Sequence, residues 1–145
     1  MYQHILVAID LSKDSGKVID AAKRLAGAGC KMSMVHVVEP IAAAYSMDIY
    51  ALNVGELQQE AINFAEKKLQ EAAAEAGIAA EDGYTLLGAP APEIRNLAEE
   101  KGVDCLVIGS HGHSGWKMLL GSTANKVLHG ATFDVLTVHV GRDQA

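Results

Sequence analysis

The sequence contains few cysteines and few aromatic residues. Its two cysteines, Cys30 and Cys105, are too few for a disulfide framework, and Cys105 falls inside an apolar segment. We therefore expect reduced thiols and a cytoplasmic protein. Aromatic residues make up 5% of the chain and hydrophobic residues 50%, so the core must be built mainly from aliphatic side chains.

Runs of basic residues and long apolar stretches are also absent. The net charge is −6 and no cluster of Lys or Arg occurs, which removes the electrostatic footprint expected for binding nucleic acid or anionic membranes. No apolar stretch approaches the roughly 20 residues needed to cross a bilayer, and no charged leader precedes an apolar segment. These absences predict a soluble protein, without membrane insertion, whose partners are small molecules or other proteins.

Short apolar segments alternate with helical patterns along the whole chain. Strands are expected at residues 4–9, 31–38, 83–87, 105–108 and 134–140. Helices are expected from Ser12 to about residue 26, after Asn53 as far as residue 76, at 93–101 and at 123–129, with an irregular loop at 41–52. This alternation predicts an α/β fold with one open parallel sheet and helices on both faces. We expect a single domain over residues 1–141 and a loose tail at 142–145.

The long central helix carries two sequence signals. Asn53 and Glu56 have the spacing of a capping box, with Asn in place of Ser or Thr. Six apolar residues then recur at helical spacing and are expected to face the core: Leu57, Ala61, Ala65, Leu69, Ala72 and Ala76.

Glycines flank the segment that follows the fourth expected strand. That strand ends at Gly109, which opens Gly109-Ser110-His111-Gly112, and Gly121-Ser122-Thr123 begins the next helical segment. Glycine lets a ligand approach main-chain N–H groups, and a helix start favours an anion. Two such corners can wrap a phosphate chain, although from the residues alone the glycines are equally well explained as turns.

This arrangement resembles the ATP-binding signature of the universal stress proteins, small adenine-nucleotide hydrolase-like domains. The resemblance spans the chain, from the segment at 4–10 to the segment at 134–138. It implies a Rossmann-like sheet of five strands in the order 3-2-1-4-5, ATP as ligand, and a homodimer formed through the last strand, Val135 to Val140. The loop from residue 113 to residue 120 is one residue shorter than the family's usual spacing.

The resemblance also implies which residues hold the nucleotide. Asp10 is assigned to the adenosine end, the Val37 backbone to adenine, and Ala8 to the same pocket. Without the resemblance, Asp10 would be an acid favoured near a helix N-terminus, and the two apolar residues would be core. The phosphate loop would supply seven residues: Gly109, Ser110, His111, Gly112, Gly121, Ser122 and Thr123.

A metal site formed by the protein itself is not predicted. His111 and His113 are two ligands, too few for a closed zinc site, and no Cys or carboxylate cluster lies near them in the sequence. Mg²⁺ or Mn²⁺ bound through the nucleotide phosphates is the expected ion, because magnesium relies on phosphate oxygens with few protein ligands.

Three functions remain open at this stage. The first is a stress-response regulator that holds ATP and relays its occupancy to a protein partner. The second is a slow ATPase, for which no catalytic residue is predicted: Lys117 is the only cation near the glycines, and neither a carboxylate nor an arginine accompanies it. The third follows from the shortened loop, which would suit AMP or cyclic AMP, or leave the site empty.

Overall fold

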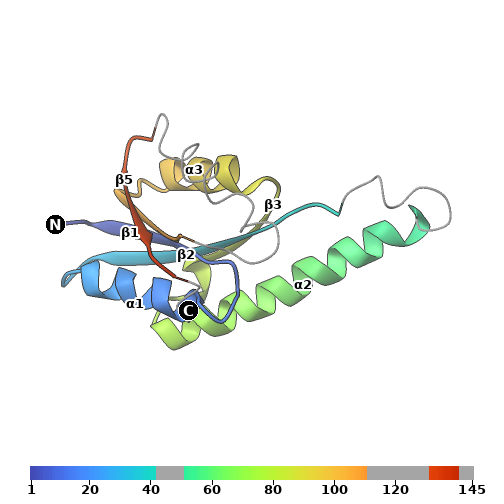
Figure 1. The fold of residues 1–145 in the computed structure, drawn as a ribbon, viewed down its shortest axis with the longest axis horizontal. Coiled ribbons are helices and arrows are strands. Elements are labelled where there is room, and N and C mark those ends of the chain that lie inside the picture. The colour runs from blue at the N-terminus through green and yellow to red at the C-terminus, as the bar shows by residue number, and fades with distance from the viewer. Residues whose placement is uncertain (42–50, 111–130, 141–145) are drawn as a thin grey trace.

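A computed structural model describes residues 1–41, 51–110 and 131–140, with the side chains of the central helix described from residue 54 onward. Five strands form one sheet in the order β3-β2-β1-β4-β5, and all neighbouring strands are parallel. Helices lie on both sides of the sheet (Figure 1). The predicted fold class and strand order are confirmed.

The strand bounds lie close to those expected from the sequence. They are β1 His4–Ala8, β2 Lys31–Val38, β3 Gly83–Leu87, β4 Cys105–Gly109 and β5 Asp134–Val138. Every residue of β1 is buried, as are the first four of β4. These two strands occupy the middle of the sheet, where both faces are covered, which explains their continuous apolar runs.

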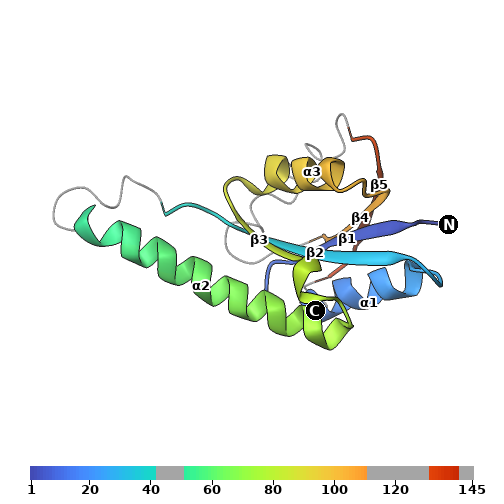
Figure 2. The ribbon, with the colours of Figure 1, turned by 180° about the vertical axis from the view of Figure 1, so that it is seen from behind.

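Each face of the sheet packs into its own apolar cluster. Helix α3 (Pro90–Glu100) covers one face with Ile94 and Leu97, which meet Leu6 and Leu106 from the central strands. Helices α1 (Ser15–Leu25) and α2 (Ala51–Ala76) cover the other face, where cluster members include Ile5, Val7, Val18, Leu69 and Val107. Figures 1 and 2 show α3 on one side of the sheet and α1 with α2 on the other.

Helix α1 begins later than the sequence suggests. Its N-cap is Asp14, and Ser12 instead accepts a hydrogen bond from the Asp14 N–H at 3.2 Å. Ser12 therefore closes a turn before the helix and does not cap it, so the expected cap was wrong. The turn keeps the chain close to the end of β1.

Helix α2 is longer than expected and only its C-terminal part covers the sheet. It starts at Ala51, so Asn53 lies in the first turn and the capping-box prediction was wrong. Ala65 and Leu69 are buried as predicted, but the side chains of Leu57 and Phe64 are 51% and 62% exposed. Figures 1 and 2 show the N-terminal part of α2 extending beyond the sheet, so periodicity there does not signal burial.

The helix predicted at 123–129 and the tail at 142–145 lie outside the described residues. So does most of the loop predicted at 41–52, whose last two residues belong to α2. Helix α3 starts at Pro90, three residues before the expected start, because proline at the first helical position has the required φ and lacks an N–H that would need a partner.

Among the described parts of the chain, no helix combines the length and apolar character needed to span a bilayer.

Candidate functional site

The winding of the chain reverses between β1 and β4. The chain leaves β1 for α1 on one face of the sheet, and it enters β4 from α3 on the other face. The two strands pair directly, with Ala8 opposite Ile108. Ligands of open α/β sheets bind beyond the carboxyl ends of strands at such a point.

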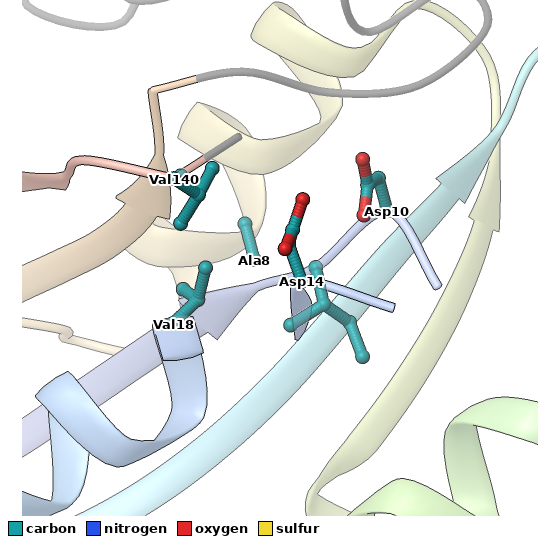
Figure 3. Close-up of a pocket in the computed structure, with 7 residues that line it drawn as sticks. Ala8, Asp10, Asp14, Val18 and Val140 are labelled. Atoms are coloured by element: carbon teal, nitrogen blue, oxygen red, sulfur yellow. The ribbon is translucent and has the colours of Figure 1, made fainter. Parts of the chain in front are cut away.

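A hollow lies at this point. It is open to solvent, and about 250 Å³ of space lies between its walls and in its mouth. Seven residues line it: Ala8, Ile9, Asp10, Asp14, Val18, Gly109 and Val140. Figure 3 shows this hollow with the side chains of its lining residues. Three residues chosen from the sequence, Ala8, Asp10 and Gly109, therefore meet around one space.

Asp10 is held by the turn that follows β1. Its Oδ1 atom accepts a hydrogen bond from the Ser12 N–H at 3.0 Å and one from the Ser15 hydroxyl at 3.4 Å. A carboxylate that bonds the backbone two residues ahead forms an Asx-turn, which fixes its direction. Asp10 lies before the first turn of α1, which contains no acid, but its carboxylate bonds Ser15, the first residue of the helix. The role of an acid near a helix N-terminus therefore stays an alternative to ligand contact.

The residue after Asp10 has an unusual backbone. Leu11 has a φ of 64°, the only positive φ of a non-glycine residue within the described ranges. A left-handed leucine costs of order 1 kcal/mol, which the surrounding turn must offset. Its cost is consistent with a turn that positions the Asp10 carboxylate.

Four lining residues were missed by sequence reasoning: Ile9, Asp14, Val18 and Val140. Asp14 sits at the N-terminus of α1, and its carboxylate lies 3.9 Å from Lys17 Nζ. Asp10, Asp14 and Val18 are four residues apart in the sequence, which was a visible signal. It was not recognised as a site because the helix was expected to begin at Ser12, before Asp14. Val140 lies beyond β5 and is 2% exposed.

Ser110 follows Gly109 at the end of β4 and is hydrogen-bonded to the chain at and beyond the end of β5. The Ser110 N–H donates to Val138 O at 2.7 Å, and the Ser110 hydroxyl accepts from the Val140 N–H at 3.0 Å. These bonds bring Val140 to the wall of the hollow. Ser110 therefore has a structural task beside the one expected for it, and it does not line the hollow.

Val37 lies near the end of β2 with its side chain 1% exposed, in the same apolar cluster as Ala8. It is not one of the seven lining residues, so only its backbone remains a candidate for ligand contact. Next to it, the Nδ1 atom of His36 lies 2.8 Å from Ile9 O. Burial lowers the pKa of His36, while the Ile9 carbonyl and the nearby Asp10 and Glu39 charges act in the opposite direction.

The remaining predicted site residues lie outside the described part of the chain. They are His111, Gly112, Gly121, Ser122 and Thr123. No group of three or more His, Cys, Asp or Glu side chains suited to a metal ion occurs within residues 1–41, 51–110 and 131–140.

The fold and the hollow define a doubly wound α/β domain with a candidate ligand site at its switch point. A family model, the Universal stress protein family, matches residues 1–139. The chain belongs to this family.

Individual relatives support the family assignment over nearly full length. Universal stress protein A homolog 1 of Coxiella burnetii is 41% identical over 139 residues, which cover 94% of this chain and 96% of the relative. A crystal structure of a universal stress protein in complex with cAMP is 29% identical, covers 95% of this chain and 97% of that one, and has a TM-score of 0.58. The universal stress protein UspA from Lactobacillus plantarum shares the fold, with a TM-score of 0.74, 22% identity, and coverage of 94% and 97%.

Proposed function

We propose that this protein binds an adenine nucleotide, with ATP as the first candidate, at the carboxyl ends of β1 and β4. One observation carries the proposal: Ala8, Asp10 and Gly109, chosen from the sequence, line a single hollow where the winding reverses. A relative solved in complex with cAMP supports an adenine nucleotide at this fold.

The described residues suit the adenosine half of such a ligand. Ala8 and the backbone of Val37 would face adenine, since Ala8 ends β1 and Val37 lies one residue before the end of β2. The fixed Asp10 carboxylate would accept hydrogen bonds from ribose hydroxyls or the adenine amino group.

The phosphates would lie beyond Gly109. Main-chain amides at Gly109, His111, Gly112, Gly121, Ser122 and Thr123 are the proposed donors. Ser110 would contribute its hydroxyl proton, because its N–H already donates to Val138 O. The described lining residues include two carboxylates, Asp10 and Asp14, and no Lys or Arg. Mg²⁺ or Mn²⁺ carried by the phosphates would reduce repulsion between this wall and the ligand.

AMP or cyclic AMP is the second candidate ligand. The relative with bound cAMP favours it, as does the loop at 113–120, which is one residue short. Hydrolysis of ATP would be slow, because the described wall of the hollow offers no cation to stabilise charge on a transferred phosphoryl group.

The biological role proposed is regulatory. A cytoplasmic stress-response protein of this kind would change its contacts with a protein partner when nucleotide occupies the site. The nucleotide-binding domain is proposed to extend over residues 1–141.

The edge strand β5 is the proposed surface of a homodimer. The Asp134 N–H donates to Asp104 O, and Val138 O accepts from the Ser110 N–H, so both residues face β4. By alternation the backbone groups of Val135 and Thr137 point away from the sheet. An edge of this kind pairs readily with a second copy. The strand offered for pairing is shorter than the expected Val135–Val140, because β5 ends at Val138.

Calorimetric titration with ATP, AMP and cyclic AMP, each with and without Mg²⁺, tests the proposal. Gly112→Val should weaken binding of the preferred nucleotide at least about tenfold, equivalent to about 1.4 kcal/mol. Gly55→Val is the control, because a Cβ on that glycine of α2 meets nothing within 4 Å. No binding of any of the three nucleotides to the unmodified protein would refute the proposal, and unchanged affinity of Gly112→Val would place the phosphates elsewhere.

A further inference from the structure

The pairing of β1 with β2 stops abruptly at the site. The register ends with Ala8 opposite Val35, and one more main-chain bond follows, from the Ile9 N–H to Val35 O at 3.0 Å. In a regular parallel ladder the next bond would run from the Val37 N–H to Ile9 O. Among the described residues no such main-chain bond forms.

A side chain takes the place of that missing bond. The Nδ1 atom of His36 lies 2.8 Å from Ile9 O. A carbonyl oxygen only accepts, so Nδ1 carries the proton and donates, in the neutral as in the charged imidazole. The carbonyl that Val37 would have used is thus occupied by the neighbouring residue of the same strand.

The hydrogen bond from His36 to Ile9 O affects two backbone groups. The Ile9 carbonyl belongs to the peptide that leads into Asp10, so the His36 bond fixes the peptide plane from which the Asp10 carboxylate extends. The Val37 N–H, which by strand alternation points toward β1, is left without its ladder acceptor at the carboxyl end of the sheet. A buried N–H without an acceptor costs about 1–3 kcal/mol, so a ligand atom that bonds it gains correspondingly.

We propose that His36 is a positioning residue for nucleotide binding. By occupying Ile9 O, it keeps β1 and β2 apart at their carboxyl ends, leaves the Val37 N–H for an acceptor nitrogen of the purine ring, and orients Asp10. His36 itself does not touch the nucleotide. This inference rests on the proposed function, since it assigns His36 a task in the same site.

The test compares three substitutions in the full chain. His36→Leu removes the donor, so the ladder closes and the Val37 N–H bonds Ile9 O. His36→Asn keeps a donor, because its Nδ2 atom occupies the position of Nδ1. Thr85→Val is the matched control: Thr85 is the β3 residue paired with His36, and its buried hydroxyl has no hydrogen-bond partner.

Two readouts move in opposite directions if the inference is right. In His36→Leu, ATP affinity measured by calorimetry should fall about tenfold, while hydrogen exchange of the Val37 amide without nucleotide should become slower. A variant that is merely destabilised would exchange faster. His36→Asn should restore both values to within about threefold, and Thr85→Val should leave ATP affinity unchanged.

The outcomes separate this inference from the proposed function. If the unmodified protein binds none of ATP, AMP and cyclic AMP, the proposed function fails. If it binds nucleotide and His36→Leu binds equally well, or if Val37 exchange in His36→Leu becomes faster, the proposed function stands and the role of His36 is refuted. Failure of His36→Asn to recover affinity would also refute it.

Discussion

The Nε2 atom of His4 lies 2.7 Å from the Ser33 hydroxyl, at the end of the sheet opposite the hollow. The Nδ1 atom of the same ring lies 3.2 Å from Lys101 O, so the imidazole joins β1, β2 and the segment after α3. Nearby, the Asp104 carboxylate accepts the N–H groups of Gln3 and His4, both at 3.0 Å. These bonds lower the pKa of Asp104.

We expect stability to fall below neutral pH because of His4. Burial lowers its pKa below the ordinary 6.5, and the Lys101 carbonyl opposes this shift. The unfolded chain therefore binds a proton before the folded chain does, so the stabilisation is complete above pH 6.5 and is lost as pH falls from there to the folded pKa. His36 has a lowered pKa too and acts in the same direction.

Urea denaturation at pH 8.0 and pH 5.5 measures this effect. His4→Gln does not titrate and keeps hydrogen-bonding groups in place, so its stability should change less between the two pH values than that of the unmodified protein. An equal change in both proteins would show that His4 does not contribute to the acid sensitivity.

Truncating the core should cost far more than truncating the projecting part of α2. Leu106 is fully buried in the central strand β4, and Leu106→Ala should lower the free energy of unfolding by about 2–5 kcal/mol. Leu57→Ala removes the same atoms from a side chain that is 51% exposed and should cost less than about 1 kcal/mol. Chemical denaturation of both variants provides the comparison, and similar costs would mean that Leu57 is buried in solution.

Asp10 should matter for nucleotide affinity more than its neighbour in the hollow. Asp10→Ala removes a fixed acceptor and should weaken ATP binding about tenfold or more, since hydrogen bonds to charged groups contribute about 1.5–3 kcal/mol. Asp14→Asn, on the same wall, should bind ATP within about threefold of the unmodified protein. Fluorescence titration measures both affinities, and a larger loss for Asp14→Asn would reverse the assignment.

Replacing Thr137 by proline should dissociate the proposed dimer. Proline removes the N–H that points away from β4 without removing a bond inside the sheet, whereas Thr137→Val keeps that N–H. Light scattering after size exclusion should show a monomer for the first variant and a dimer for the second. A dimer in both cases would place the contact on another surface.

The sequence predicts the sheet better than it predicts the helices. The bounds of β2 and β3 were correct because turns flank short apolar runs, and the strand order was available from the family resemblance. The starts of α1 and α2 were wrong because Ser12 and Asn53 are common both in caps and in other local positions. Leu57 was assigned to the core because a helical stripe does not reveal where the sheet beneath it stops.

The hollow was predictable only in part. Ala8, Asp10 and Gly109 end or follow strands, so topology places them together. Val140 depends on the Ser110 hydroxyl, a contact across 30 residues that no local pattern shows. The role proposed for His36 depends on where the pairing of β1 with β2 stops, which no local sequence pattern shows either.

Tyr2 and Asp134 share a 2.6 Å hydrogen bond that raises the pKa of Tyr2 to about 12. This bond joins the beginning of the chain to β5, and the two amides held by Asp104 join it to the start of β4. All three bonds lie at the end of the sheet opposite the hollow. Substitutions around the hollow can therefore alter the proposed ligand site while these bonds at the other end of the sheet are kept. For protein engineering, the consequence is that deleting the first four residues would remove these bonds, whereas substitutions around Asp14 would leave them in place.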